Sequence, residues 1–218
     1  DKYLKRFPRS KNAYEMDFYL AECLYNSFQF QQAAKQRGLL DAGFSGTKQQ
    51  VRDAIRILPD GELKWQALQG YVYGKGIAGA QIFCGVPEFL QRARKIGHTV
   101  LIVSHKTEFG HLDPDRINLR GAALGWMEAQ GFFSDRGFSM LRDNVHFAST
   151  RSEKVRRIAD LACDVFVDDL EEVLADPDFP PSVHRILFSE NGGEAEGLPY
   201  RLCRDWHAIE EAVFFGCR

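Results

Sequence analysis

Short apolar runs alternate with helical patterns through most of this 218-residue chain. Residues 98–104 and 164–167 predict strands that are buried on both faces, because their centres are apolar without alternation. Helical patterns with start signals separate such runs, and Thr150 with Glu153 forms a capping box before one of them. Repeated strand, helix and strand segments predict a parallel sheet with helices on both faces. We therefore expect an α/β fold with a Rossmann-like parallel sheet.

The first third of the chain predicts helices only. Thr47 can cap a helix over residues 47–58, and a second helix follows the turn at residues 59–61, so residues 37–80 predict a small helical cap. Helical patterns over residues 13–24 and 28–35 predict an N-terminal helical hairpin within residues 1–36. The remaining residues, 81–218, then form the α/β core.

Charge and cysteine content narrow the classes of partner and compartment. Twenty-eight basic residues against thirty acidic ones give a net charge of −2, and no block of five like charges occurs. This balance predicts neither nucleic-acid binding nor a polybasic membrane patch. Five scattered cysteines without a CxxC pair argue against a disulfide framework and a thiolate zinc site. With no apolar run near ~18 residues and a polar start, we expect a cytoplasmic protein. Since the first residue is not methionine, the sequence leaves open a processed chain or a fragment.

Polar side chains follow two of the expected strands. Asp168 and Asp169 end one strand, and Ser104 ends another. Adjacent carboxylates raise each other's pKa unless a cation lies beside them, and Mg²⁺ prefers such oxygen ligands. Lys154, near the start of the preceding helix, would project toward the same edge of the sheet. A hydroxyl, a lysine and a carboxylate pair along one sheet edge favour phosphoryl transfer.

In order and context, the segments VLIVS (100–104), TRSEK (150–154) and VFVDD (165–169) resemble the second, third and fourth motifs of the haloacid dehalogenase-like (HAD) hydrolases. From about residue 36 onward, the chain resembles especially the HAD-like proteins often found with bacterial surface-polysaccharide genes. The resemblance implies a Rossmann-like core, a helical cap inserted after the first strand, a bound Mg²⁺ and hydrolysis of a phosphate ester.

The resemblance also assigns roles to individual residues. Carried over by motif, Ser104 binds the transferring phosphoryl group, Lys154 stabilises it, and Asp168 with Asp169 helps to hold Mg²⁺. The loop beyond Ser104 is interpreted as contacting substrate, with His105 and Lys106 as candidate phosphate or sugar contacts. Two histidines and three carboxylates in residues 105–115 fit no known transition-metal spacing.

The Asp-x-Asp nucleophile motif of a HAD phosphatase has no clear counterpart. The closest string, residues 16–20, has tyrosine where the second carboxylate belongs, and Asp113-Pro114-Asp115 follows Ser104 in a loop. We assign neither as nucleophile. Residues 7–10, 20–25 and 28–34 instead resemble a tetratricopeptide-type hairpin. Loss of the strand by truncation or fusion, a pseudoenzyme, and an unrecognised substitute segment all remain open.

Two functions follow from these observations. The first is a Mg²⁺-dependent phosphatase that acts on a small phosphorylated metabolite such as a sugar phosphate. The alternative is a catalytically inactive HAD-like binding or scaffold protein that docks a protein partner through the hairpin at residues 10–36. A metal-free nucleotide-binding domain is disfavoured, because no GxGxxG loop follows any expected strand.

Overall fold

The computed structural model of the protein describes residues 17–20, 28–110, 112–190, 192 and 197–215. The chain divides into two compact units. The first unit takes Asp1–Leu24, Ile82–His105 and Gly131–Arg218, and the second takes Tyr25–Gln81 and Lys106–Gln130. The boundaries expected from the sequence fell after residues 36 and 80, whereas the second unit also includes residues 25–36 and 106–130.

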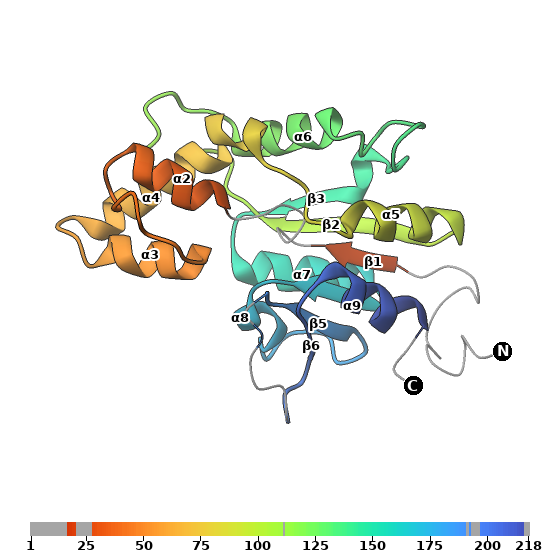
Figure 1. Ribbon diagram of the computed structural model, residues 1–218. Helices are drawn as coiled ribbons and strands as arrows, with labels where there is room; N and C mark the ends of the chain where they lie inside the picture. Colours follow the sequence, from red (N-terminus) through yellow and green to blue (C-terminus); the bar gives the residue numbers. More distant parts are fainter. Residues whose placement is uncertain (1–16, 21–27, 111, 191, 193–196, 216–218) are drawn as a thin grey trace. The chain divides into compact units, whose positions relative to one another are not determined.

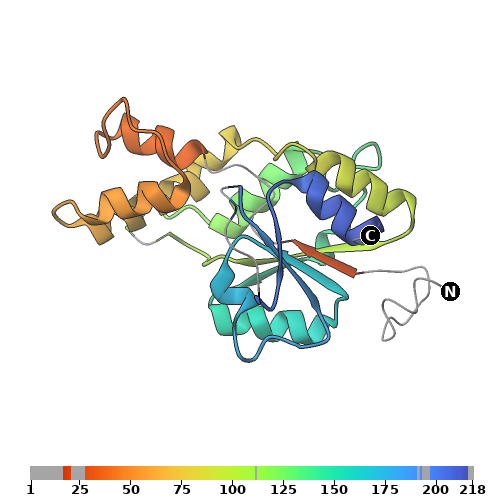
Figure 2. The same cartoon turned by 60° about the horizontal axis from the view of Figure 1, so that its bottom comes forward.

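The first unit is built on a parallel sheet, as predicted (Figure 1). Its six described strands lie in the order β3-β2-β1-β4-β5-β6. Their bounds are β1 Asp17–Leu20, β2 Thr99–His105, β3 Val145–Ala148, β4 Val165–Asp168, β5 His184–Phe188 and β6 Arg201–Cys203. The helical segments are α5 Val86–Lys95, η3 Arg142–Asn144, α7 Arg151–Leu161, α8 Glu171–Leu174, α9 Trp206–Glu210 and η4 Glu211–Phe215. Figure 2 shows α5 and α9 on one face of the sheet and α7 on the other.

β1 corrects the N-terminal prediction. Residues 17–20 pair in parallel with both β2 and β4 and so form a central strand, although we predicted a helix over residues 13–24. The helical hairpin is therefore wrong at these residues, and the rest of its first helix lies outside the described residues. A four-residue strand carries little local signal, and pairing with two apolar neighbours overrides a weak helical pattern. The hairpin's second helix is confirmed as α2, Phe28–Gln36.

The order of the strands creates a switch point beside β1. From β1 the chain proceeds outward through β2 and β3, then crosses to β4 and proceeds outward on the other side through β5 and β6. In open parallel sheets, ligands bind outside the carboxyl ends of the strands where the direction of winding reverses. The carboxyl ends of β1 and β4 flank that position here.

Helix α7 covers the sheet beside this switch point. The Thr150 side chain accepts the Glu153 N–H at 3.1 Å, so the predicted cap is present. The inner face of α7 places Val155 and Ile158 in the same buried cluster as strand residues Leu101, Val103 and Phe166. Because α7 directly follows β3, it begins at the carboxyl edge of the sheet.

The second unit is helical. Its elements are α2, α3 Lys48–Arg56, α4 Gly61–Tyr73, η2 Lys75–Gly79 and α6 Leu119–Ala129. Thr47 and Gln50 form a full capping box before α3, which confirms the predicted start. Phe30, Trp65 and Tyr73 lie at the centre of its core, with both ring pairs of Phe30 closer than 5.5 Å between centroids (5.2 and 5.3 Å). None of the described helices is long and apolar enough to cross a membrane.

Candidate functional site

A buried ion pair lies at the carboxyl end of β4. Lys154 Nζ on α7 is 2.6 Å from Asp168 Oδ2, and both side chains are almost fully enclosed, with 2% and 0% of their surfaces exposed. The other carboxylate oxygen, Oδ1, accepts the Leu170 N–H at 3.0 Å. Asp168 is therefore held from two sides, and it holds the lysine in turn.

The surroundings of Asp168 disfavour its charge. Burial raises the pKa of the Asp168 carboxyl to about 6, because an enclosed carboxylate loses its hydration. The Lys154 ammonium opposes this rise, and the negative Asp169 next to it adds to it. A buried pair of this kind persists only where its partners are in direct contact, as they are here.

Ser104 lies on β2, at the same edge of the sheet but not beside β4. β1 separates the two strands, so with strands ~4.8 Å apart the backbones at Ser104 and Asp168 are about 10 Å apart. Side chains alternate between the faces of a strand, and Leu101 and Val103 pack with α7. Ser104 therefore belongs to the opposite face, away from the ion pair.

Asp169 follows β4 directly and is partly exposed, in contrast to the enclosed Asp168. The two carboxylates predicted as one metal pair thus occupy different environments. Asp168 is engaged by Lys154 and by a backbone N–H, whereas Asp169 is the carboxylate that solvent reaches. Among the described residues, no group of three or more His, Cys, Asp or Glu side chains is arranged to hold a metal ion.

His105 and Lys106, predicted to contact substrate, lie in different units. The His105 ring Nε2 is 3.1 Å from the Ser149 carbonyl oxygen and, as the protonated nitrogen, donates to it. This bond joins the end of β2 to the residues that precede α7. Lys106 is buried in the second unit, with Nζ 3.9 Å from the centroid of the Tyr73 ring.

Asp17 lies at the wrong end of β1 to act with these residues. It pairs with Thr99, whereas Ser104 is five residues farther along β2, about 16 Å at ~3.3 Å per residue. No other carboxylate belongs to the described part of β1, and residues 21–27 lie outside the described residues. The second rejected candidate, the Asp113 carboxylate, accepts the N–H groups of Asp115 and Ile117.

Sequence reasoning missed two side-chain contacts of the first unit. The Glu153 carboxylate accepts the Ser149 N–H at 2.7 Å, so the capping box also fixes the residue that bonds His105. The Tyr200 hydroxyl donates to the Glu171 carboxylate at 2.7 Å and ties the segment before β6 to α8. The capping motif gave a local signal for the contact between Glu153 and Ser149. The contact between Tyr200 and Glu171 joins residues 29 positions apart and had no local signal.

Comparison with solved structures identifies the fold. An L-2-haloacid dehalogenase aligns over 90% of this chain and 96% of its own, with a TM-score of 0.52 and 14% sequence identity. A HAD-superfamily hydrolase from Ehrlichia chaffeensis aligns over 92% of this chain and 95% of its own, with a TM-score of 0.48 and 10% identity. No protein-family profile and no curated protein matches the sequence. The likeness to the dehalogenase shows that the fold is HAD-like, as the sequence motifs predicted.

Proposed function

We propose that this chain, whose fold is HAD-like, is a Mg²⁺-dependent phosphohydrolase that acts on a small phosphorylated metabolite such as a sugar phosphate. The observation that carries the proposal is the enclosed Lys154–Asp168 ion pair at the carboxyl end of β4, beside the switch point of the sheet. Phosphoryl transfer depends mainly on positioned charge, and a lysine fixed by a buried carboxylate supplies it. A HAD-like fold can carry hydrolysis of a phosphate ester or other chemistry, so these residues, and not the fold, favour phosphate-ester hydrolysis.

The oxygen ligands at the carboxyl edge of the sheet fit a Mg²⁺ ion that is held by a single protein carboxylate. Asp169 is partly exposed and makes no side-chain hydrogen bond or ion pair with the described residues, so its oxygens are open to a cation. Mg²⁺ commonly takes one or two carboxylates and completes its shell with phosphate oxygens and water. When bound, the ion would neutralise charge on the phosphoryl oxygens.

The protein's own residues then have separate tasks. Asp168 positions Lys154, whose ammonium offsets negative charge on the phosphoryl group. Ser104 lies at the carboxyl end of β2 on the opposite face of the sheet, so its hydroxyl would donate to the same phosphoryl group where that group lies over the edge of the sheet at β1, between the two faces. His105 positions the start of α7 through the Ser149 carbonyl instead of contacting substrate. Asp17 does not accept the phosphoryl group, because it lies at the opposite end of β1.

The test is release of inorganic phosphate from a panel of sugar phosphates and other small phosphate esters, with Mg²⁺ and with EDTA. We expect Mg²⁺-dependent release that falls at least 100-fold in Asp169→Asn and at least tenfold in Ser104→Ala. Asp160→Asn is the matched control, because Asp160 is an exposed carboxylate near the other end of α7. Release that persists in EDTA, or that Asp169→Asn leaves intact, would contradict the proposal.

A second candidate is a HAD-like binding protein without turnover. One specific observation favours it: Asp17 is the sole carboxylate in the described part of β1, and it lies away from Ser104. Such a protein would bind a phosphate ester with Mg²⁺ and release no phosphate. Calorimetric binding combined with the release assay separates the two functions. Docking of a protein partner through residues 10–36 is not proposed further, because residues 17–20 form a strand and not a helical hairpin.

A further inference from the structure

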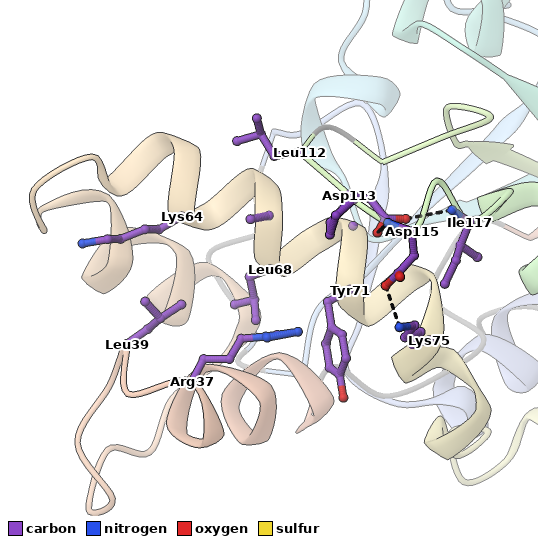
Figure 3. Close-up of a pocket in the computed structure, with 13 residues that line it drawn as sticks. Arg37, Leu39, Lys64, Leu68, Tyr71, Lys75, Leu112, Asp113, Asp115 and Ile117 are labelled. Atoms are coloured by element: carbon purple, nitrogen blue, oxygen red, sulfur yellow. Dashed lines mark hydrogen bonds and ion pairs between the residues drawn. The ribbon is translucent and has the colours of Figure 1, made fainter.

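The second unit contains a pocket of its own, with a volume of about 570 Å³ (Figure 3). This volume falls within the range of pockets that enclose small organic ligands. The pocket opens between the end of α2, one side of α4 and the segment after residue 111. Its lining comes entirely from the second unit: Arg37, Leu39, Lys64, Ala67, Leu68, Gly70, Tyr71, Lys75, Leu112, Asp113, Pro114, Asp115 and Ile117.

The wall formed by residues 112–117 is fixed in place. The two Asp113 oxygens accept backbone N–H groups of Asp115 and Ile117, at 3.1 and 2.8 Å. Lys75 Nζ is 2.5 Å from Asp115 Oδ2, which ties this wall to the helical segment after α4. Just before the wall, a Cβ added to Gly110 would lie 2.7 Å from Gly70 Cα, so the two backbones meet closely there. A preformed wall lowers the entropy cost of binding.

The charges around the pocket are not balanced. The Asp113 carboxylate is occupied by backbone N–H groups, and Asp115 is paired with Lys75. Within the part of the chain that the structure describes, Arg37 and Lys64 make no ion pair. The Arg37 guanidinium instead lies over the Tyr71 ring, 3.8 Å from its centroid, and Figure 3 shows it extending across the pocket toward that ring. Stacking leaves the edge of a guanidinium, with its N–H donors, open to an anion.

The remaining lining is apolar. Leu39, Leu68 and Ile117 line the pocket, and Leu112 stands at its rim with 58% of its surface exposed. Leu112 also has a left-handed backbone, with φ 57°, which is costly for a leucine. An exposed leucine held in a strained conformation beside an apolar pocket is consistent with a surface that a ligand covers.

We propose that this pocket binds an amphipathic anion, a small molecule with an aliphatic or aromatic body and one carboxylate, sulfonate or phosphate group. The apolar body lies against Leu68 and Tyr71, and the anionic group is received by the Arg37 guanidinium. The pocket shares no residue with the Lys154–Asp168 site, so this inference does not depend on the proposed phosphohydrolase activity.

The probe is 8-anilinonaphthalene-1-sulfonate, an aromatic anion whose fluorescence rises in apolar surroundings, titrated into the full chain. We expect saturable binding that weakens at least tenfold in Arg37→Gln, since a hydrogen bond to a charged group contributes about this factor or more. Ala67→Glu places a carboxylate on an exposed lining position of α4 and should weaken binding similarly. Arg52→Gln, on α3 outside the pocket, should leave binding within twofold.

A neutral analogue, N-phenyl-1-naphthylamine, separates charge recognition from general apolar binding. Its affinity should be weaker than that of the anion and should be unchanged by Arg37→Gln. Far-UV circular dichroism establishes that each variant is folded. The inference is overturned if the anion does not bind saturably, or if folded Arg37→Gln and Ala67→Glu variants bind it as tightly as the unmodified chain.

Discussion

Replacing Lys154 by methionine should sharply destabilise the first unit. Methionine keeps the length and unbranched shape of the side chain and removes the ammonium, which lies 2.6 Å from Asp168 Oδ2. Asp168 has no exposed surface, and its pKa, already raised to about 6 beside the ammonium, would rise further, so the group must either remain charged without hydration or take up a proton to fold. Of the two polar contacts described for the Asp168 carboxylate, only the Leu170 N–H would be left.

The size of the effect follows from this enclosure. Removing one partner of a buried ion pair typically costs about 3–5 kcal/mol, because the other charge stays desolvated. Replacing both partners by apolar residues of similar volume is often close to neutral. The double variant Lys154→Met with Asp168→Leu should therefore lose only about 1–2 kcal/mol, mainly from the Leu170 N–H that lacks an acceptor.

Urea unfolding at neutral pH in EDTA, followed by far-UV circular dichroism, measures each loss. Lys95→Met is the matched control, because Lys95 is exposed at the end of α5 and should change stability by less than about 0.5 kcal/mol. The reasoning is refuted if Lys154→Met costs no more than Lys95→Met. It is refuted equally if the double variant is less stable than Lys154→Met, since the two losses would then arise independently.

Four further substitutions, at three sites and one control position, test other parts of the structure. Burial and the nearby positive charge of Arg157 lower the pKa of His146 in the folded protein. In the unfolded chain the imidazole keeps its ordinary pKa of about 6.5 and is protonated first, so the folded state loses stability as the pH drops through about 6.5. His146→Phe should therefore flatten the decline in urea midpoint between pH 7 and 5. Gly61→Ala should lower the free energy of unfolding in urea by about 1–3 kcal/mol, because its Cβ would lie 2.4 Å from the Ile55 carbonyl oxygen. Gly125→Ala, in the interior of α6 with open space around the Cβ position, should instead raise it by about 0.5–1 kcal/mol. Burial raises the pKa of Tyr200 to about 12, so Tyr200→Phe should remove one tyrosine ionisation near pH 12 from an ultraviolet titration, and an unchanged curve would contradict that assignment.

The fold was predictable wherever the sequence carried a long apolar run or a helix-capping motif. The run at residues 98–104 gave β2, and the capping residues Thr47 and Thr150 gave the starts of α3 and α7. β1 and β6, of four and three residues, were missed because such strands are defined by their partners and not by their own pattern. The sequence placed residues 119–129 within the α/β core at 81–218, whereas α6 belongs to the helical unit, because its membership depends on packing of Leu119 with distant residues.

The candidate site was predictable in its residues and less so in its geometry. In a parallel sheet, the start of a helix and the end of the strand that follows it both lie at the carboxyl edge. A lysine at the first position and a carboxylate at the second therefore converge, as Lys154 and Asp168 do. The face on which Ser104 lies could not be predicted, because a continuously apolar strand shows no alternation. The pocket in the second unit gave no signal, because three separate segments of the chain form it.

The apolar double variant also distinguishes a structural role of the ion pair from a functional one. A buried pair usually contributes no more stability than an apolar pair of the same size, so its presence at the switch point calls for another reason. If the pair serves phosphoryl binding, the double variant of Lys154 and Asp168 should fold with nearly full stability and fail to bind a phosphate ester with Mg²⁺. If that folded variant bound the ester as tightly as the unmodified chain, Lys154 would have no part in recognition. The site would then have to be rebuilt around Ser104 and Asp169 alone.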